Sequence, residues 1–140
     1  MGSLTFEDAL SEGTPLVRVG ETEAWAYAVE DMPTLGIRTE LLAGLSSKGG
    51  EAFALSYTPT INTFMYAADG ELVNGFDLTV PHIRYGSEQH RFEEQMALAG
   101  FADDAVPVPG EMGARFVELV FGITFTADLL ERPLPALTVQ

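Results

Sequence analysis

Apolar positions in the middle of the chain alternate with a period of two residues, which is the period of a β-strand. The alternation runs from residue 51 to residue 78 and is interrupted by a TPT triplet and by Asp69-Gly70. Asp-Gly is a strong signal for a two-residue hairpin turn. Asn74-Gly75, inside the last segment, indicates a β-bulge. The pattern therefore predicts three antiparallel strands at residues 51–58, 62–68 and 71–78.

Two further strands are predicted nearer the N-terminus, at residues 15–19 and 23–30, with a turn at 20–22 between them. The second alternates alanine with large apolar residues, namely Trp25, Tyr27 and Val29. Its small-residue face would allow a helix to pack closely. We expect all these strands to form one antiparallel sheet.

After Pro81 the apolar period changes to 3.6 residues, the period of an amphipathic helix. The first predicted helix spans residues 88–99, with Ser87 as its cap and Gly100 after its last residue. The second spans residues 111–121, is followed by Gly122, and is joined to the first by a connector at residues 103–110. Their expected buried stripes are Phe92, Met96 and Ala99, and then Met112, Phe116, Leu119, Val120 and Ile123.

Shorter helices are predicted elsewhere from capping residues and apolar spacing. They span residues 5–12, 40–45 and 127–131, with a loop at 31–36 before the second. Thr39 is the expected cap of that helix, and its leucines share a face: Leu41, Leu42 and Leu45.

Strands precede helices along the chain, which is the order of an α+β domain. We expect an antiparallel β-meander sheet of four to five strands with the C-terminal helices packed on one face. The 140 residues are expected to form a single domain, 1–140. It would comprise an N-terminal segment (1–14), a sheet region (15–80, with the short helix at 39–46) and a helical region (87–132).

The composition narrows the class of protein. The chain is 46% hydrophobic, as expected of a folded domain, and it contains no cysteine, which excludes disulfides and thiolate metal sites. No apolar run approaches the roughly 20 residues of a membrane-spanning helix. The N-terminal residues lack the basic and apolar stretches of a secretion signal. We therefore expect a cytoplasmic protein with no membrane partner.

Charge is the second strong feature. The chain has 21 acidic and 7 basic residues, for a net charge of −14. Nucleic acids and anionic membranes repel such a protein, so neither is expected as a direct partner. One interpretation is an acidic mimic of nucleic acid that inhibits a DNA-binding protein. The other, which we favour, is that acids spread along the chain keep the protein soluble.

Motifs for common chemistries are absent from the sequence. It contains no G-x-x-x-x-G-K-[ST], G-x-G-x-x-G or G-x-S-x-G pattern, so we expect no nucleotide cofactor and no serine nucleophile. Metal ligands would come from His90 with Glu94 or from His82 with Asp77, but the spacing indicates no third ligand. We therefore predict no metal and no cofactor.

One segment, FDLTVPHIRYGS at residues 76–87, is richer in reactive side chains than its surroundings. It places Asp77, His82, Arg84 and Tyr85 in a loop before a predicted helix N-terminus, a position that favours ligands. These four residues are the candidate binding site. The architectural alternative, which we favour, is an Asp77–Arg84 ion pair that fixes the loop, with Tyr85 packed inward.

Several of these segments occur in a characteristic order: AWAYAVED, a leucine helix before a Gly-rich turn, FMYAADGELVNGFD and P-x-x-R-Y-G-S. In that order they resemble an actinobacterial family of small proteins catalogued only as a domain of unknown function. The resemblance covers residues 17–101, and the later TFTADLLERPLP is compatible with the C-terminus of that family. It implies the fold and a bacterial source, but no activity, substrate or catalytic residue.

The leading functional hypothesis is a non-enzymatic protein-interaction or accessory domain, of immunity type, with a protein partner. It follows from the missing catalytic motifs, the acidity and the aromatic-rich strands. The alternatives are a small-ligand-binding or catalytic domain that uses the loop 77–87, and the acidic nucleic-acid mimic.

The net charge of −14 generates the first prediction. The free energy of unfolding should rise between about 10 mM and about 150 mM salt, because screening weakens the repulsion among the carboxylates. Chemical denaturation at the two salt concentrations measures this change. No gel shift with duplex DNA is expected at physiological salt. Stability that falls steadily with added salt, or a clear gel shift, would contradict the electrostatic argument.

Overall fold

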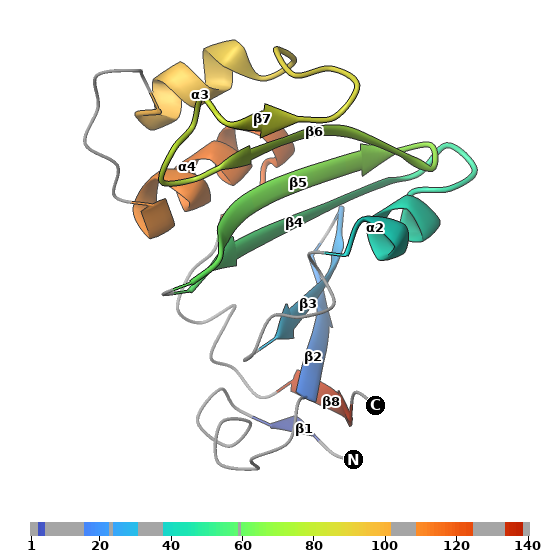
Figure 1. Cartoon of the computed structure of the whole chain (residues 1–140). Coiled ribbons are helices and arrows are strands. Elements are labelled where there is room, and N and C mark those ends of the chain that lie inside the picture. The colour runs from blue at the N-terminus through green and yellow to red at the C-terminus, as the bar shows by residue number, and fades with distance from the viewer. Residues whose placement is uncertain are drawn as a thin grey trace. The chain divides into compact units, whose positions relative to one another are not determined.

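The chain forms two compact units. Residues 1–34 and 125–140 make the first unit, and residues 35–124 make the second. The computed structural model describes residues 3–4, 16–22, 24–30, 38–58, 60–101, 109–124 and 134–138 (Figure 1). Within those ranges no helix has both the length and the apolar character needed to cross a membrane.

The second unit is built on a four-stranded antiparallel sheet. Asp69 and Gly70 form the turn between the second and third strands, with positive φ angles of 49° and 81°, as in a two-residue turn that matches the strand twist. The three long strands confirm the predicted strands to within one residue, whereas the two-residue fourth strand was not predicted. The strand order is β4 (Glu51–Tyr57), β5 (Asn62–Ala68), β6 (Glu71–Asp77) and β7 (Arg84–Tyr85).

β6 contains the predicted bulge. Tyr66 of β5 pairs with Asn74, but the next residue, Ala67, pairs with Leu72, so Val73 is the extra residue. The bulge lies one residue before the expected position. An extra residue bends the strand and turns backbone groups out of the ladder, where another segment can bond to them.

That other segment is the backbone directly after β7. The Ser87 N–H donates to the carbonyl oxygen of Leu72 at 3.2 Å, and the Glu88 N–H donates to that of Val73 at 2.7 Å. Gly86 precedes them with a φ of 101°, and a Cβ there would lie 2.5 Å from the Val73 carbonyl oxygen. Only glycine fits this position. The bulge and the segment after β7 therefore hold each other in place.

This pairing explains why the helix predicted at residues 88–99 begins later than expected. α3 (Glu93–Ala99) begins five residues later than expected, and Ser87 is not its cap. The reason is that the N–H groups of Ser87 and Glu88 are bonded to the sheet, while Asn74 donates a side-chain hydrogen bond to the Glu88 carbonyl at 2.9 Å. These bonds hold residues 87 and 88 against β6 in a backbone conformation that is not helical. The predicted end is correct, because Gly100 follows with a left-handed φ of 104°.

α4 (Pro109–Phe121) confirms the predicted helix at 111–121, but its buried stripe is rotated. Phe116 and Val117 are fully buried, whereas Leu119, which was expected in the core, is 45% exposed. The cause is Gly113, where a Cβ would lie 3.1 Å from Leu55 of β4. Without a side chain at Gly113, α4 approaches the sheet on that side and turns Leu119 outward.

The core lies between the sheet and these C-terminal helices, which pack on one face as predicted. Phe64 of β5 and Phe116 of α4 meet edge to face with ring centroids 4.8 Å apart, the geometry that aromatic quadrupoles favour. Phe53 of β4 stacks on Phe121 of α4 at 4.3 Å. The cluster comprises Phe53, Phe64, Tyr66, Phe76, Phe92, Phe101, Phe116 and Phe121.

The opposite face of the sheet is covered at one end by α2 (Thr39–Leu45). Leu42 is 2% exposed and packs with Met65 and Ala67. Of the three leucines that were expected to share a face, only Leu42 is buried, because Leu41 and Leu45 are 39% and 64% exposed. Thr39 is the first helical residue and not the cap, a position that Arg38 occupies.

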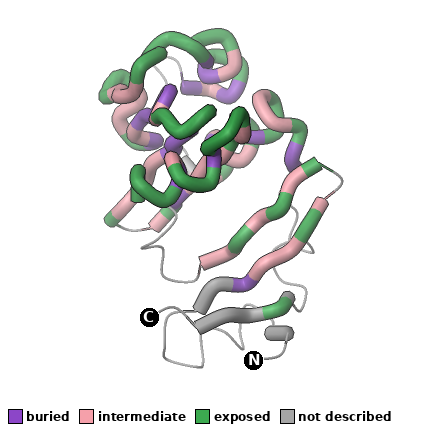
Figure 2. Tube along the Cα trace, turned by 90° about the vertical axis from the view of Figure 1, so that its right-hand side faces the viewer, coloured by how far each residue is buried: buried purple, intermediate pink, exposed green. Residues whose placement is uncertain are grey.

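The first unit contains a second antiparallel sheet, in the order β1 (Ser3–Leu4), β8 (Leu134–Thr138), β2 (Leu16–Glu21) and β3 (Ala26–Glu30). The alternation predicted for β3 is confirmed, because its alanines are exposed and Tyr27 and Val29 are partly buried (Figure 2). Two expectations were wrong: β3 belongs to a different sheet from β4, and the turn begins only after Glu21. The strands β1 and β8 were not predicted.

Four predicted segments fall mostly or wholly outside the described residues. They are the helices at 5–12 and 127–131, the loop at 31–36 and the connector at 103–110, whose last two residues belong to α4.

The aromatic core generates the second prediction. Phe116→Ala should lower the free energy of unfolding by about 3–5 kcal/mol, because a fully buried ring leaves a cavity against Phe64 and Phe76. Leu119→Ala, on the same helix, is the matched control and should cost far less. Urea denaturation measures both variants. Equal losses in the two variants would mean that the orientation of α4 has been misassigned.

Candidate functional site

The candidate loop does not project from the sheet. After β6 the chain turns, with the Ile83 N–H donating to the Val80 carbonyl at 2.9 Å, and returns as β7 along β6. Phe76 pairs with Arg84 and Gly75 with Tyr85. Residues 84 and 85 of the loop are therefore part of the sheet, and their side chains point to opposite faces.

Asp77 lies at the end of β6 and closes the turn. Its Oδ1 accepts hydrogen bonds from the Thr79 backbone N–H at 2.7 Å, the Thr79 hydroxyl at 2.6 Å and the Val80 N–H at 2.9 Å. Partial burial alone would raise the pKa of Asp77, but the bonds from Thr79 and Val80 outweigh it and lower the pKa below its usual value. The carboxylate is thus ionised and engaged in holding the turn.

Arg84 points to the other face, toward α3. Its Nε donates to the Pro81 carbonyl at 3.1 Å, its Nη1 donates to the Gln89 carbonyl at 3.3 Å, and Nη1 forms an ion pair with Glu93. The expected Asp77–Arg84 pair is therefore not formed. The register explains why: Arg84 lies opposite Phe76, and Asp77 is one residue further along the strand, on the opposite face.

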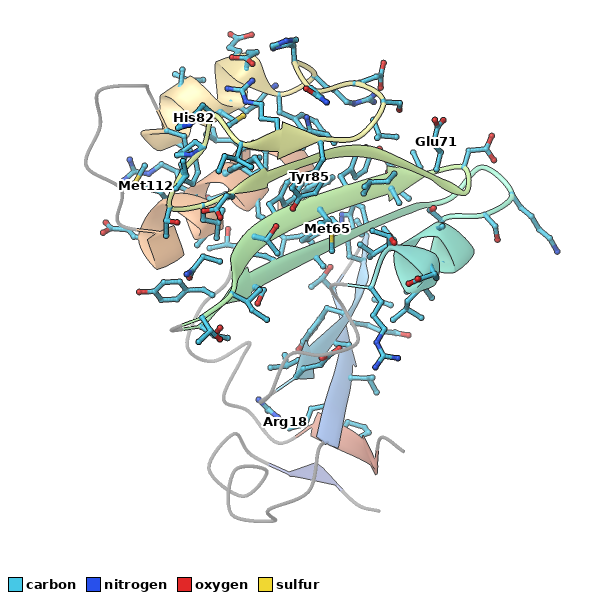
Figure 3. The ribbon with its side chains drawn as sticks, in the orientation of Figure 1. Arg18, Met65, Glu71, His82, Tyr85 and Met112 are labelled. Atoms are coloured by element: carbon cyan, nitrogen blue, oxygen red, sulfur yellow. The ribbon has the colours of Figure 1, made fainter. Side chains whose placement is uncertain are left out.

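Tyr85 packs inward, as the architectural alternative expected. It lies on the same face as Met65, beside the small apolar cluster beneath α2 (Figure 3). Its hydroxyl contacts the Thr63 hydroxyl and donates to the Phe64 carbonyl at 3.3 Å. Burial raises the pKa of Tyr85; the nearby Asp77 charge also raises it, and the Thr63 bond lowers it. The phenol is neutral at physiological pH and anchors β7 to β5.

His82 is exposed on the turn before β7 (Figure 3). Asp77 and Tyr85 therefore lie on one face of the sheet, near Thr63, whereas Arg84 lies on the other face. The structure does not bring the four predicted side chains into one site. Whether any of them binds a ligand stays a prediction.

A family model matches residues 8–132 of the chain. This match extends past both ends of the region, residues 17–101, over which the motifs showed a resemblance. The chain belongs to DUF6461, a family of unknown function. No curated protein and no solved structure matches it. Membership in DUF6461 confirms the suspected relationship and brings no activity, ligand or catalytic residue with it.

A charged cluster that the motifs did not indicate lies beside β7 in this DUF6461 member. Glu93 Oε1 forms the ion pair with Arg84 and also lies 2.9 Å from His90 Nδ1. From the sequence, His90 and Glu94 were the residues considered as a pair of metal ligands, four residues apart on a helix. Because α3 begins only at Glu93, His90 precedes the helix and meets Glu93. No group of three metal-ligating side chains occurs among the residues that the structure describes.

A second polar cluster in the DUF6461 chain surrounds Tyr66 at the rim of the aromatic core. Its hydroxyl donates to Glu51 Oε1 at 2.6 Å, and the Arg91 guanidinium lies 5.6 Å from the ring centroid. Burial, and then the bond to Glu51, raise the pKa of Tyr66 to about 12. A phenol held so firmly protonated is a hydrogen-bond donor and a poor acid catalyst at neutral pH.

The bonds of Arg84 generate the third prediction. Arg84→Ala should lower the free energy of unfolding by about 1–3 kcal/mol, because two backbone carbonyls and Glu93 lose their donor. Glu93→Gln removes only the ion pair with a half-exposed carboxylate and should cost less than about 1 kcal/mol. Thermal and urea denaturation distinguish the two variants. A melting temperature unchanged in Arg84→Ala would contradict the architectural role and return the loop to consideration as a binding site.

Proposed function

We propose that this DUF6461 member is a non-enzymatic protein-binding domain that acts in the cytoplasm as an accessory or immunity-type protein. The observation that carries the proposal is the exposure of large apolar side chains on a unit whose core is otherwise well packed. Six such side chains among the described residues are 39–64% exposed: Leu41, Leu45, Tyr57, Ile83, Leu98 and Leu119. Two of them, Leu41 and Leu45, lie four residues apart on one face of α2, and exposed apolar groups that lie together are typical of surfaces that meet a partner.

The bonding of the candidate loop supports a binding role over a catalytic one. Asp77, Arg84 and Tyr85 each bond to the protein's own backbone, so they would have to give up these bonds to act on a substrate. For this reason we rank the small-ligand or catalytic alternative second, with His82 as the exposed group of that loop.

Net charge indicates the chemistry of the partner. A chain of charge −14 attracts basic surfaces and repels acidic ones over about a Debye length. We therefore expect a protein partner with a positively charged contact surface. The nucleic-acid mimic is a special case of this expectation, in which the positive surface is a DNA-binding groove.

The fourth prediction tests the proposed function. The tagged full chain should capture one basic protein from a lysate of its host, identified by mass spectrometry. Calorimetry with the two purified proteins should then give a Kd that rises with salt, because screening weakens the charge attraction. His82→Ala is the control and should bind as the parent does.

Two results would redirect this assignment. A small molecule that copurifies with the parent and is lost in His82→Ala would favour the ligand-binding alternative. A captured DNA-binding protein that duplex DNA displaces would favour the mimic. A lysate that yields no protein able to bind the purified chain contradicts the proposed function.

A further inference from the structure

Two of the exposed apolar side chains lie together on α2. Leu41 and Leu45 are four residues apart, which places them one above the other on the same face of the helix. They are 39% and 64% exposed, while Leu42 packs against Met65 and Ala67. α2 thus has a buried side that contacts the sheet and an apolar side that faces outward.

The outward face is held rigidly by the turn between β5 and β6. The Gly70 N–H donates to Ser46 Oγ at 3.2 Å, and the Gly49 N–H donates to Asp69 Oδ1 at 2.8 Å. These bonds tie the end of α2 to the hairpin turn. A seven-residue helix is too short to be stable alone, so the bonds preorganise the two leucines and lower the ordering cost of binding.

Exposed carboxylates lie on the same elements as this surface. Glu40 on α2 and Asp69 and Glu71 at the hairpin turn are all exposed, and Glu71 marks the end of the sheet where α2 lies (Figure 3). The bases that flank α2 along the chain are Arg38, its N-cap, and Lys48. Carboxylates outnumber bases three to two on these segments, in a chain that is strongly acidic as a whole.

We infer that this surface, formed by α2 and the β5–β6 turn, binds a basic amphipathic segment of a partner protein. Apolar side chains of the segment cover Leu41 and Leu45, and its lysine or arginine side chains meet Glu71 and Glu40. The inference rests on the proposed function and specifies the chemistry of the partner.

A second copy of the chain suits this surface less well. A two-fold interface would place the same patch on both sides, so the carboxylates of Glu40 and Glu71 would face their own counterparts. Two chains of charge −14 also repel one another before contact. Charge complementarity thus favours a different, basic occupant.

The experiment, our fifth prediction, uses a synthetic amphipathic peptide of leucine and lysine as the probe and a leucine and glutamate peptide as its control. Nuclear magnetic resonance of the labelled full chain should show shifts confined to α2 and the β5–β6 turn with the lysine peptide only. Leu45→Ser should weaken peptide binding about tenfold, the loss expected when one leucine is no longer buried. Leu98→Ser on α3 is the matched control, because Leu98 is 62% exposed, and should bind like the parent.

Three results of the peptide experiment would overturn the inference: shifts centred on other elements, equal weakening by Leu45→Ser and Leu98→Ser, or equal binding of the two peptides. Sedimentation that shows a dimer dispersed by Leu45→Ser would identify a second copy as the occupant and also overturn it. A host protein that binds the parent and Leu45→Ser alike contradicts this inference and leaves the proposed function standing. A lysate without a partner contradicts the proposed function even where the peptide binds as expected.

Discussion

The second unit depends on one irregularity in its sheet, the extra residue Val73 in β6. Because that residue cannot pair with β5, the carbonyls of Leu72 and Val73 turn aside and accept the N–H groups of Ser87 and Glu88. This pairing draws the segment after β6 back onto the sheet as β7. Because of this pairing, α3 begins only at Glu93. Phe92 then lies at the start of the helix, with its ring against the aromatic core.

The same pairing determines what the candidate loop does. Once residues 84 and 85 form a strand, successive side chains point to opposite faces. Arg84 reaches Glu93 on the side of α3, and Tyr85 reaches Thr63 on the other side. Side chains that are crowded together in the sequence are thereby separated by the thickness of the sheet. A cluster of reactive residues in a sequence indicates a site only where the backbone lets those residues converge.

The two faces of the sheet have different roles. The face beneath α3 and α4 is closed by interlocking aromatic rings, so it supplies stability and leaves little to bind a partner. On the face beneath α2, Leu42 packs into a smaller cluster with Met65 and Ala67, and the helix keeps two more leucines exposed. This exposed apolar pair adds nothing to the core, and it is the surface that our proposal assigns to a partner.

Local signals in the sequence determined the strands at residues 51–58, 62–68 and 71–78, the Asp69-Gly70 turn, the presence of a bulge and the helix end at Gly100. Each depends on residues close in the chain, through alternation or backbone conformation. The late start of α3, the outward rotation of Leu119, the placement of β3 in a separate sheet and the partners of Arg84 were decided only by the tertiary structure. They depend on contacts between distant segments, such as Ser87 with Leu72 and Gly113 with Leu55, which no local pattern encodes.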